Sequence, residues 1–120
     1  MKILVTGATG FIGVSLCKAL ITLPDVSVVG SGRSSIELVA TNFVFSKVTD
    51  TSTAGEWRNI LEGVDVVIHL AARAHVLSEI SSDPLVEFKK VNVEGTLMLA
   101  EQAINAGVKR FIFLSSIGVN

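Results

Sequence analysis

The residues best suited to chemistry form a glycine-rich segment near the start of the chain, Thr6-Gly7-Ala8-Thr9-Gly10-Phe11-Ile12-Gly13. Gly7 would permit a tight turn, Gly10 would leave room for an anion against the backbone, and Gly13 would let a helix pack closely on a sheet. The segment follows an apolar run and opens a helical pattern, so the free N–H groups of a helix N-terminus would face the anion. This context predicts a pyrophosphate-binding loop rather than a glycine-rich turn without a ligand.

The segment after the second apolar run bears on which dinucleotide the loop would hold. Gly30-Ser31-Gly32-Arg33-Ser34-Ser35 contains no carboxylate, and Asp25 lies at the wrong end of the run. A carboxylate there would accept hydrogen bonds from the ribose 2′-hydroxyl of NAD, whereas an arginine accommodates the 2′-phosphate of NADP. Arg33 with Ser34 could therefore bind a 2′-phosphate. Equally consistent is Arg33 stacking on adenine while NAD binds through Asp50 and the loop, and a solvated Arg33 is the less favoured alternative.

Polar residues in and after the fourth apolar run are further candidates. Arg73 and His75 follow Ala71-Ala72, where the reactive ring of a dinucleotide would lie, and they would either reach a substrate or face water. His69 lies inside the run, which favours a hydrogen-bonded core histidine over a general base. A metal site is improbable because no cysteine or second histidine stands at ligand spacing. Asp65, at the start of the run, is interpreted as a strand-entry cap rather than a catalytic acid.

These candidates are positioned by apolar runs that alternate with segments of helical periodicity. Short β-branched or aromatic runs predict strands, and apolar residues at three- and four-residue spacing predict helices. The expected strands are 3–5, 26–29, 43–45, 64–70 and 111–114. The expected helices are 12–21, 53–62 and 84–106, with at most one or two helical turns around 36–40. Gly63 and Gly107 would end the last two helices. On the last helix, one face would carry Val86, Val93, Leu97, Ala100 and Ile104.

Strands separated by helices imply right-handed crossovers and a parallel sheet. The fourth run is nearly continuously apolar, as expected of a central strand that is buried on both faces. We therefore predict an α/β protein with a three-layer Rossmann fold and a doubly wound parallel sheet of strand order 3-2-1-4-5, truncated after the fifth strand. Residues 1–120 would form one dinucleotide-binding domain.

Composition excludes several classes of protein. The chain has 120 residues and a formal net charge of -1, and 49% of its residues are hydrophobic while 18% are charged. Such a chain has too much apolar surface to stay disordered and lacks the basic excess of a nucleic-acid binder. No apolar run approaches the roughly 20 residues that span a bilayer. The single cysteine, Cys17, excludes an internal disulfide and is expected in the core. We expect a cytoplasmic protein with no nucleic-acid or membrane partner.

Together with the loop, four later segments resemble the short-chain dehydrogenase/reductase superfamily, in its extended branch of nucleotide-sugar epimerases and dehydratases. The loop with the preceding valine, Val5 to Gly13, is similar to the glycine signature of that branch. The later segments that agree with it, in chain order, are Asp50, His69-Leu70-Ala71-Ala72, Asn92-Val93-Glu94-Gly95-Thr96 and Phe113-Leu114-Ser115-Ser116. The resemblance covers essentially the whole chain.

The resemblance implies roles for individual residues. Ser116 would be the catalytic serine, which hydrogen-bonds the substrate oxygen and a tyrosinate that exchanges the proton. Asp50 would meet the adenine amino group, and the backbone after His69 would lie beside the nicotinamide ribose. The side chains of Phe11 and Ile12 are expected to pack, although both residues belong to the cofactor loop. The residues expected to contact the cofactor are Gly7, Thr9, Gly10, Phe11, Ile12, Gly13, Arg33, Ser34, Asp50, Thr51, Leu70, Ala71, Ala72, Arg73, Asn92 and Ser115.

The resemblance also implies a function. The chain would supply the dinucleotide-binding part of an NAD(P)-dependent epimerase or dehydratase, similar to UDP-glucose 4-epimerase, that acts on a UDP-sugar through a 4-keto intermediate. The alternatives are an NADP-dependent reductase of a non-sugar carbonyl and a dinucleotide-sensing protein without turnover. The sequence contains no tyrosine. We therefore expect this chain to be inactive alone and to belong to a longer protein, which could form a homodimer. We also expect residues 111–114 to form an edge strand that no further structure covers.

Overall fold

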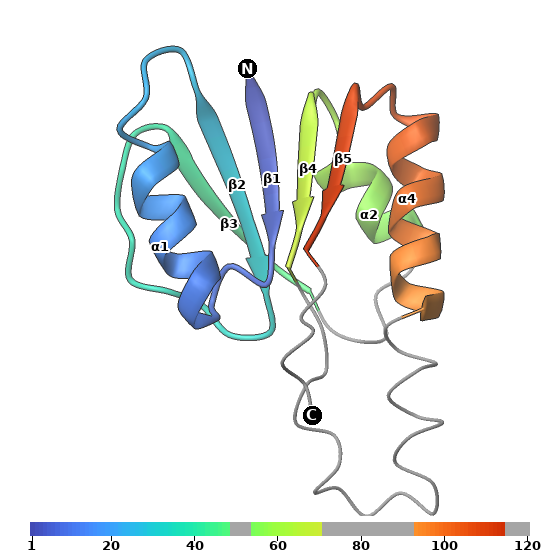
Figure 1. Ribbon diagram of the computed structural model, residues 1–120, viewed down its shortest axis with the longest axis horizontal. Coiled ribbons are helices and arrows are strands. Elements are labelled where there is room, and N and C mark those ends of the chain that lie inside the picture. The colour runs from blue at the N-terminus through green and yellow to red at the C-terminus, as the bar shows by residue number, and fades with distance from the viewer. Residues whose placement is uncertain (49–53, 71–92, 115–120) are drawn as a thin grey trace, which may run out of the picture.

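Five parallel strands form the centre of the computed structural model, which describes residues 1–48, 54–70 and 93–114. The strands are β1 (Lys2–Thr6), β2 (Ser27–Gly32), β3 (Phe43–Lys47), β4 (Val66–His69) and β5 (Arg110–Phe113). Their order in the sheet is β3-β2-β1-β4-β5, and each neighbouring pair is parallel (Figure 1). The predicted doubly wound sheet and its strand order are confirmed.

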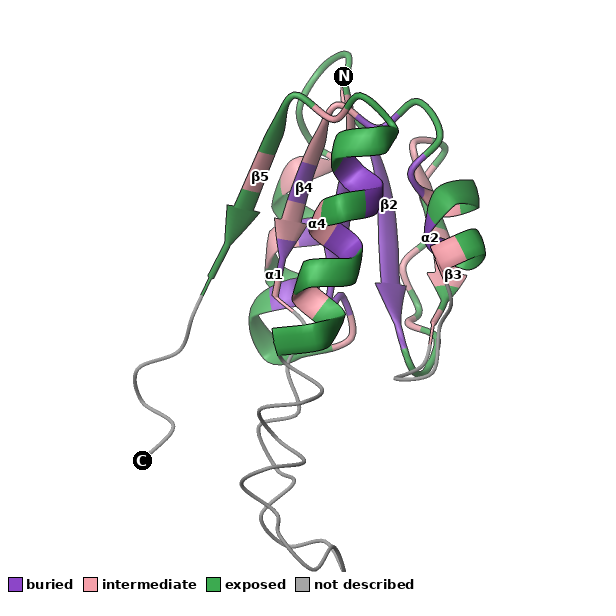
Figure 2. Cartoon of the chain, turned by 90° about the vertical axis from the view of Figure 1, so that its right-hand side faces the viewer, coloured by how far each residue is buried: buried purple, intermediate pink, exposed green. Residues whose placement is uncertain are grey.

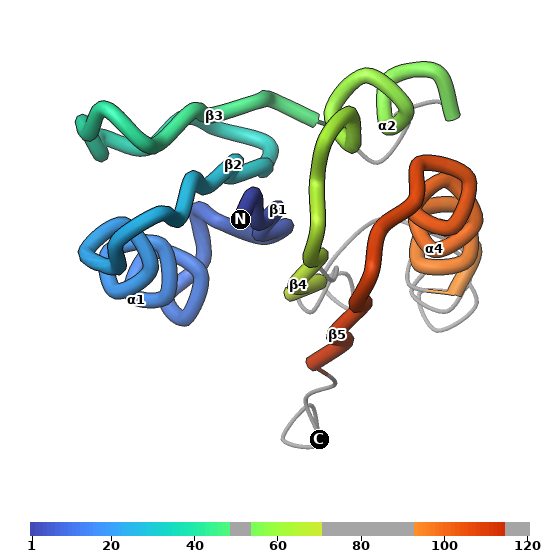
Figure 3. The backbone as a smooth tube through the Cα atoms, turned by 90° about the horizontal axis from the view of Figure 1, so that it is seen from above, coloured from blue at the N-terminus to red at the C-terminus, as the bar shows by residue number. Residues whose placement is uncertain are grey.

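Helices cover both faces of this sheet. α1 (Phe11–Leu20) lies on one face, and α2 (Ala54–Ile60) and α4 (Gly95–Asn105) lie on the other (Figure 3). Because neighbouring strands are parallel, their carboxyl ends lie at the same edge of the sheet. The glycine-rich segment between β1 and α1 follows the carboxyl end of β1.

Two apolar clusters hold the layers together. On the face covered by α2 and α4, the cluster centres on Leu4, Trp57, Leu61, Val67 and Leu99. On the face covered by α1, the buried members are Ile3, Val5, Ala8, Cys17 and Val28. The core position predicted for Cys17 is confirmed, and burial raises the pKa of its thiol. A buried, protonated thiol is unreactive, which fits a packing role.

Residues 36–40, for which at most one or two helical turns are expected, have no regular structure. Leu38 packs against the cluster on the α1 face, whereas the Val39 side chain is 98% exposed. A short helix needs a packed face to offset the cost of its first turn. One packed leucine does not provide such a face.

The fourth strand is buried on one face only. Val67 and His69 of β4 are buried on the side of α2 and α4, while Val66 and Ile68 are half-buried on the other side. In the part of the chain that the structure describes, the helix on that second side is α1, which packs on β1 and β2. The predicted burial of the fourth strand on both faces is confirmed for the face of α2 and α4 and wrong for the other face, which is half-buried.

α4 turns an unexpected face toward the core. Leu99, Gln102 and Ala103 are buried, while Leu97 and Ile104 of the expected apolar face are 63% and 77% exposed. Leu99 and Ala103 belong to the apolar cluster of this face, so packing against α2 and the sheet orients the helix. Gly107 has φ 81 and directly follows the last turn, as predicted for a helix stop. The part of the predicted helix from 84 to 92 lies outside the described residues.

β5 is exposed along much of its length (Figure 2). It pairs with β4 on one side, and its Ile112 and Phe113 side chains are 44% and 49% exposed. Among the described strands none pairs with its other side, as expected for residues 111–114. Among the described helices, none is long and apolar enough to cross a membrane.

Candidate functional site

The glycine-rich loop joins β1 to α1 in the geometry that its sequence predicts. Gly7 has φ 68, a left-handed conformation that glycine adopts without strain. The N–H of Gly10 donates to the Gly7 carbonyl at 3.1 Å, which closes the turn. The N–H of Ala8 donates to the carbonyl of Ser31 at 2.9 Å, so the loop is also fixed against the end of β2.

Gly13 and Gly10 serve the loop in different ways. A Cβ atom at Gly13 would lie 2.1 Å from the Gly7 carbonyl oxygen and 2.8 Å from the Ala8 Cα, so the fold itself requires glycine there. A Cβ atom at Gly10 would meet its nearest neighbour, the Gly7 carbonyl oxygen, at 3.4 Å. Gly10 also has φ -75 and ψ 171, which any residue can adopt. The surrounding chain therefore does not demand glycine at position 10, and the open backbone is available to a ligand.

The N-terminus of α1 lacks the groups that usually satisfy a helix start. Gly10 is its N-cap and offers no side-chain hydrogen bond, and the first turn carries no acidic residue. The first N–H groups of a helix have no partner within the helix and carry a partial positive charge. The loop can therefore hold a pyrophosphate through backbone N–H groups.

Phe11 and Ile12 do not pack as expected. Their side chains are 92% and 62% exposed. The buried residues of α1 are Gly13 and Cys17, and residues 11 and 12 in its first turn lie outside this buried side. The prediction that these side chains pack was wrong, whereas their assignment to the cofactor loop is not tested by the structure.

The end of β2 lies beside the loop. A Cβ atom at Gly32 would lie 3.0 Å from the Thr9 side chain, which shows how closely the loop covers the strand end. The exposed Arg33 and Ser34 follow directly, without a carboxylate. Lys47, at the end of β3, is the register partner of Gly32 and is also exposed. Sequence reasoning gave Lys47 no role, and its place opposite the residue that precedes Arg33 appears only when the strands are paired.

A row of polar side chains crosses the sheet at its carboxyl edge. Ser46, Ser31, Thr6 and His69 are register partners on adjacent strands β3, β2, β1 and β4. Register partners in a parallel sheet project from the same face, here the face of α2 and α4. Each member of this row is the last or second-to-last residue of its strand. Its Ser31 hydroxyl is buried and has no hydrogen-bond partner among the residues that the structure describes.

We expect Ser31→Ala to stabilise the chain, because a buried hydroxyl without a partner loses its hydration on folding. The gain in the free energy of unfolding should be about 1 kcal/mol. Urea unfolding measures it, with Ser46→Ala as the matched control in the same row. Destabilisation by Ser31→Ala would show instead that the hydroxyl has a partner in solution.

His69 is hydrogen-bonded on both ring nitrogens. Its Nδ1 lies 2.6 Å from Thr6 Oγ1, and its Nε2 lies 3.0 Å from Thr96 Oγ1 in the first turn of α4. Burial lowers the pKa of His69 to about 4, so the ring is neutral at neutral pH. The prediction of a hydrogen-bonded core histidine is confirmed. Sequence reasoning missed Thr6 and Thr96 as its partners, although both stand inside the segments that carried the resemblance.

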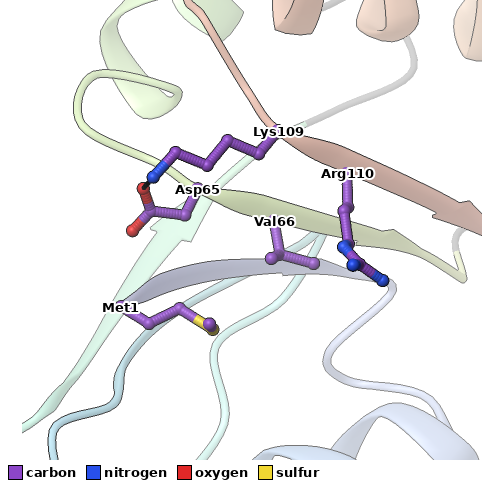
Figure 4. A pocket seen from close by; sticks show the side chains of 5 residues that line it. All are labelled: Met1, Asp65, Val66, Lys109 and Arg110. Carbon is purple, nitrogen blue, oxygen red and sulfur yellow. Dashed lines mark ion pairs between the residues drawn. The ribbon is translucent and has the colours of Figure 1, made fainter.

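The opposite edge of the sheet is occupied by Asp65 and its partners. Asp65 Oδ2 accepts a hydrogen bond from the Lys2 N–H at 2.9 Å, and Lys109 Nζ lies 3.7 Å from Oδ1. The Lys2 N–H is the main reason that the pKa of Asp65 lies below its usual range. These contacts agree with a strand-entry cap. The shallow hollow beside them is lined by Met1, Asp65, Val66, Lys109 and Arg110, far from the glycine loop (Figure 4).

Several predicted site residues lie outside the described residues. Leu70 directly follows β4 and belongs to the described part of the chain. The predictions that fall on residues outside it concern Asp50, Thr51, Ala71, Ala72, Arg73, His75, Asn92, Ser115 and Ser116. Among the residues that the structure describes, no group of three or more histidine, cysteine, aspartate or glutamate side chains could hold a metal ion.

The sequence of the chain matches a known protein family. Residues 3–119 match the NAD dependent epimerase/dehydratase family. The chain belongs to this family. It is 42% identical over 119 residues to a UDP-glucose 4-epimerase of Vibrio cholerae, and the match covers 99% of this chain and 36% of that protein. It is 30% identical to a dTDP-D-glucose 4,6-dehydratase of Mus musculus, over 96% of this chain and 35% of that protein.

Solved structures give the same fold. The UDP-glucuronic acid 4-epimerase of Bacillus cereus, in complex with UDP-glucuronic acid and NAD, superposes with a TM-score of 0.81 at 29% identity. The superposition covers 98% of this chain and 40% of that chain. The chain thus spans well under half the length of these relatives. It corresponds to the part of these relatives that contains the glycine loop and the five-stranded sheet.

Proposed function

We propose that this chain is the dinucleotide-binding part of an NAD(P)-dependent epimerase or dehydratase that acts on a nucleoside-diphosphate sugar, with a UDP-sugar as the favoured substrate. The observation that carries the proposal is the loop between β1 and α1. Gly10 is open above the backbone although the fold does not require glycine there, and the N-terminus of α1 has no side-chain cap. The UDP-sugar complex of the Bacillus cereus relative supports the substrate class.

Different residues of the chain would contact different parts of the cofactor and substrate. Backbone N–H groups of the loop, from Gly7 to Gly13, would bind the pyrophosphate, and Thr9 would cover the end of β2. Leu70 would lie beside the nicotinamide ribose, and Ser116 would hold the substrate oxygen. A bound nicotinamide would supply hydride transfer. The sequence has no tyrosine for the proton exchange. We therefore expect the chain to bind the cofactor weakly and not to turn over UDP-glucose, and measurable turnover would contradict this assignment.

Gly10→Val tests the loop directly. Valine fits the backbone angles of Gly10 but is a poorer N-cap residue than glycine, so the free energy of unfolding should fall by no more than about 1 kcal/mol. Its side chain would fill the space where the pyrophosphate approaches, and we expect dinucleotide affinity in a calorimetric titration to fall at least about tenfold. Val39→Ala, at a 98% exposed side chain away from the loop, is the control. Unchanged affinity in Gly10→Val would refute the loop assignment.

We further propose that Arg33, with Ser34 and Lys47, lets the chain accept NADP at least as well as NAD. Two exposed cations stand at the adjacent ends of β2 and β3, and the strand end has no carboxylate to repel a 2′-phosphate. Arginine is well suited to bind a phosphate because its guanidinium offers paired donors.

Parallel titrations with NAD and NADP test this cofactor assignment. Arg33→Ala should weaken NADP binding by about tenfold and leave NAD binding nearly unchanged, because the effect of a charge-assisted hydrogen bond is about 1.5 kcal/mol. Lys18→Ala, which removes a cation from the far end of α1, should change neither affinity. NAD binding that is tenfold tighter than NADP binding would contradict the assignment.

A further inference from the structure

We propose that His69 is a positioning residue of the dinucleotide site, which holds the backbone after β4 through a chain of hydrogen bonds from Thr6 to Thr96. This inference rests on the proposed function, because the backbone that it holds is the one expected beside the nicotinamide ribose. The residue touches no reacting atom in this scheme. It acts through the Thr6 hydroxyl and the Leu70 N–H.

The lengths of the hydrogen bonds assign the protons of the imidazole. The 2.6 Å contact between Thr6 Oγ1 and His69 Nδ1 is short for an N–H donor and typical of an O–H donor. The 3.0 Å contact between Nε2 and Thr96 Oγ1 is typical of an N–H donor. In the proposed arrangement, Thr6 donates its hydroxyl hydrogen to Nδ1, and the Nε2–H group donates to Thr96. The ring is neutral and carries its hydrogen on Nε2.

This arrangement orients the Thr6 hydroxyl. Because its hydrogen points at Nδ1, an oxygen lone pair is left to accept the N–H of Leu70, at 2.9 Å. The carbonyl of His69 in turn accepts the N–H of Leu114 at 3.2 Å. One buried ring thus connects the end of β1, which leads into the glycine loop, with the end of β4 and with the first turn of α4. Loss of the Nδ1 contact would remove the hydrogen bond that joins the Thr6 hydroxyl, and through it the Leu70 N–H, to the His69 ring.

A simpler role would be packing. The His69 ring stacks on Phe113 with centroids 5.5 Å apart, and its centroid lies 6.1 Å from that of Phe111. Two substitutions separate these roles. His69→Phe keeps a flat ring for the stack and removes both hydrogen bonds, whereas His69→Asn gives up the ring and keeps an oxygen acceptor near the position of Nδ1.

The first experiment measures dissociation constants for NAD and NADP with the original chain and both variants, after circular dichroism has confirmed that each is folded. We expect His69→Phe to bind about tenfold more weakly, because it removes the hydrogen bond between Nδ1 and the Thr6 hydroxyl, which accepts the Leu70 N–H. His69→Asn should bind within about threefold of the original chain. If His69→Phe binds like the original chain, or if His69→Asn loses as much affinity as His69→Phe, the positioning role is overturned.

The second experiment reads the imidazole itself by 15N NMR near neutral pH. We expect an unprotonated Nδ1 and a protonated Nε2 in the original chain and in Thr6→Ser, and loss of this signature in Thr6→Val. A ring protonated on Nδ1 would overturn the proposal even if the dinucleotide binds, which leaves the proposed function intact. If the original chain binds neither dinucleotide, the proposed function fails, and the positioning role fails with it even when the signature is as expected.

Discussion

Gly13→Ala should destabilise the chain by about 3 kcal/mol or more. The added methyl would lie 2.1 Å from the Gly7 carbonyl oxygen and 2.8 Å from the Ala8 Cα, and both neighbours are backbone atoms. Inserting one methyl group into a packed site usually costs about 1–3 kcal/mol, and the cost is larger when no flexible side chain can move away. To accommodate it, α1 must shift away from the loop, so dinucleotide binding should be lost as well.

Urea unfolding of Gly13→Ala measures this effect. Gly95→Ala is the matched control, because a Cβ at this other helical glycine would meet nothing within 4 Å. We expect Gly95→Ala to raise the free energy of unfolding by up to about 1 kcal/mol through its better helix propensity. A Gly13→Ala chain as stable as the original would show that α1 does not approach the Gly7 carbonyl so closely.

Acid should destabilise the chain through His69, and the loss of stability should begin at a higher pH than the titration of carboxylates. The pKa of His69 is about 4 in the folded chain, because the ring is buried, and about 6.5 in an unfolded chain. Between these values the unfolded state binds a proton that the folded state does not, so the free energy of unfolding falls as pH falls. Over this span the loss should reach about 3 kcal/mol, and above about pH 7 it should vanish.

Urea unfolding between pH 4 and pH 8 tests this expectation in the original chain and in His69→Asn. The variant cannot titrate at this position, so its stability should fall less steeply between pH 6.5 and pH 4. Asp65, whose pKa is lowered chiefly by the Lys2 N–H, remains in both chains and contributes equally to both curves. Parallel curves for the two chains would mean that His69 is not held neutral by the fold.

The sequence by itself predicted the elements whose signal is local. The order of the sheet follows from short apolar runs joined by helical connections, and the confirmed strand order needed no more than the handedness of those connections. The conformation of Gly7 and the close packing at Gly13 follow from the spacing of the glycines between a strand and a helix. The chemistry of the loop was predicted for the same reason, because backbone N–H groups and glycines act within one turn of the chain.

Tertiary structure decided what depends on partners distant in the sequence. Periodicity grouped Val93, Leu97 and Ile104 on one face of a helix, but packing against α2 and the sheet determined which face is buried. Likewise, His69 is identifiable as a core residue from its apolar neighbours. Its partners Thr6 and Thr96 lie on other elements, and only the register of β1 with β4 and the docking of α4 bring their hydroxyls to the ring. Local patterns fix which elements form, whereas burial and hydrogen bonding across the sheet depend on how those elements pack.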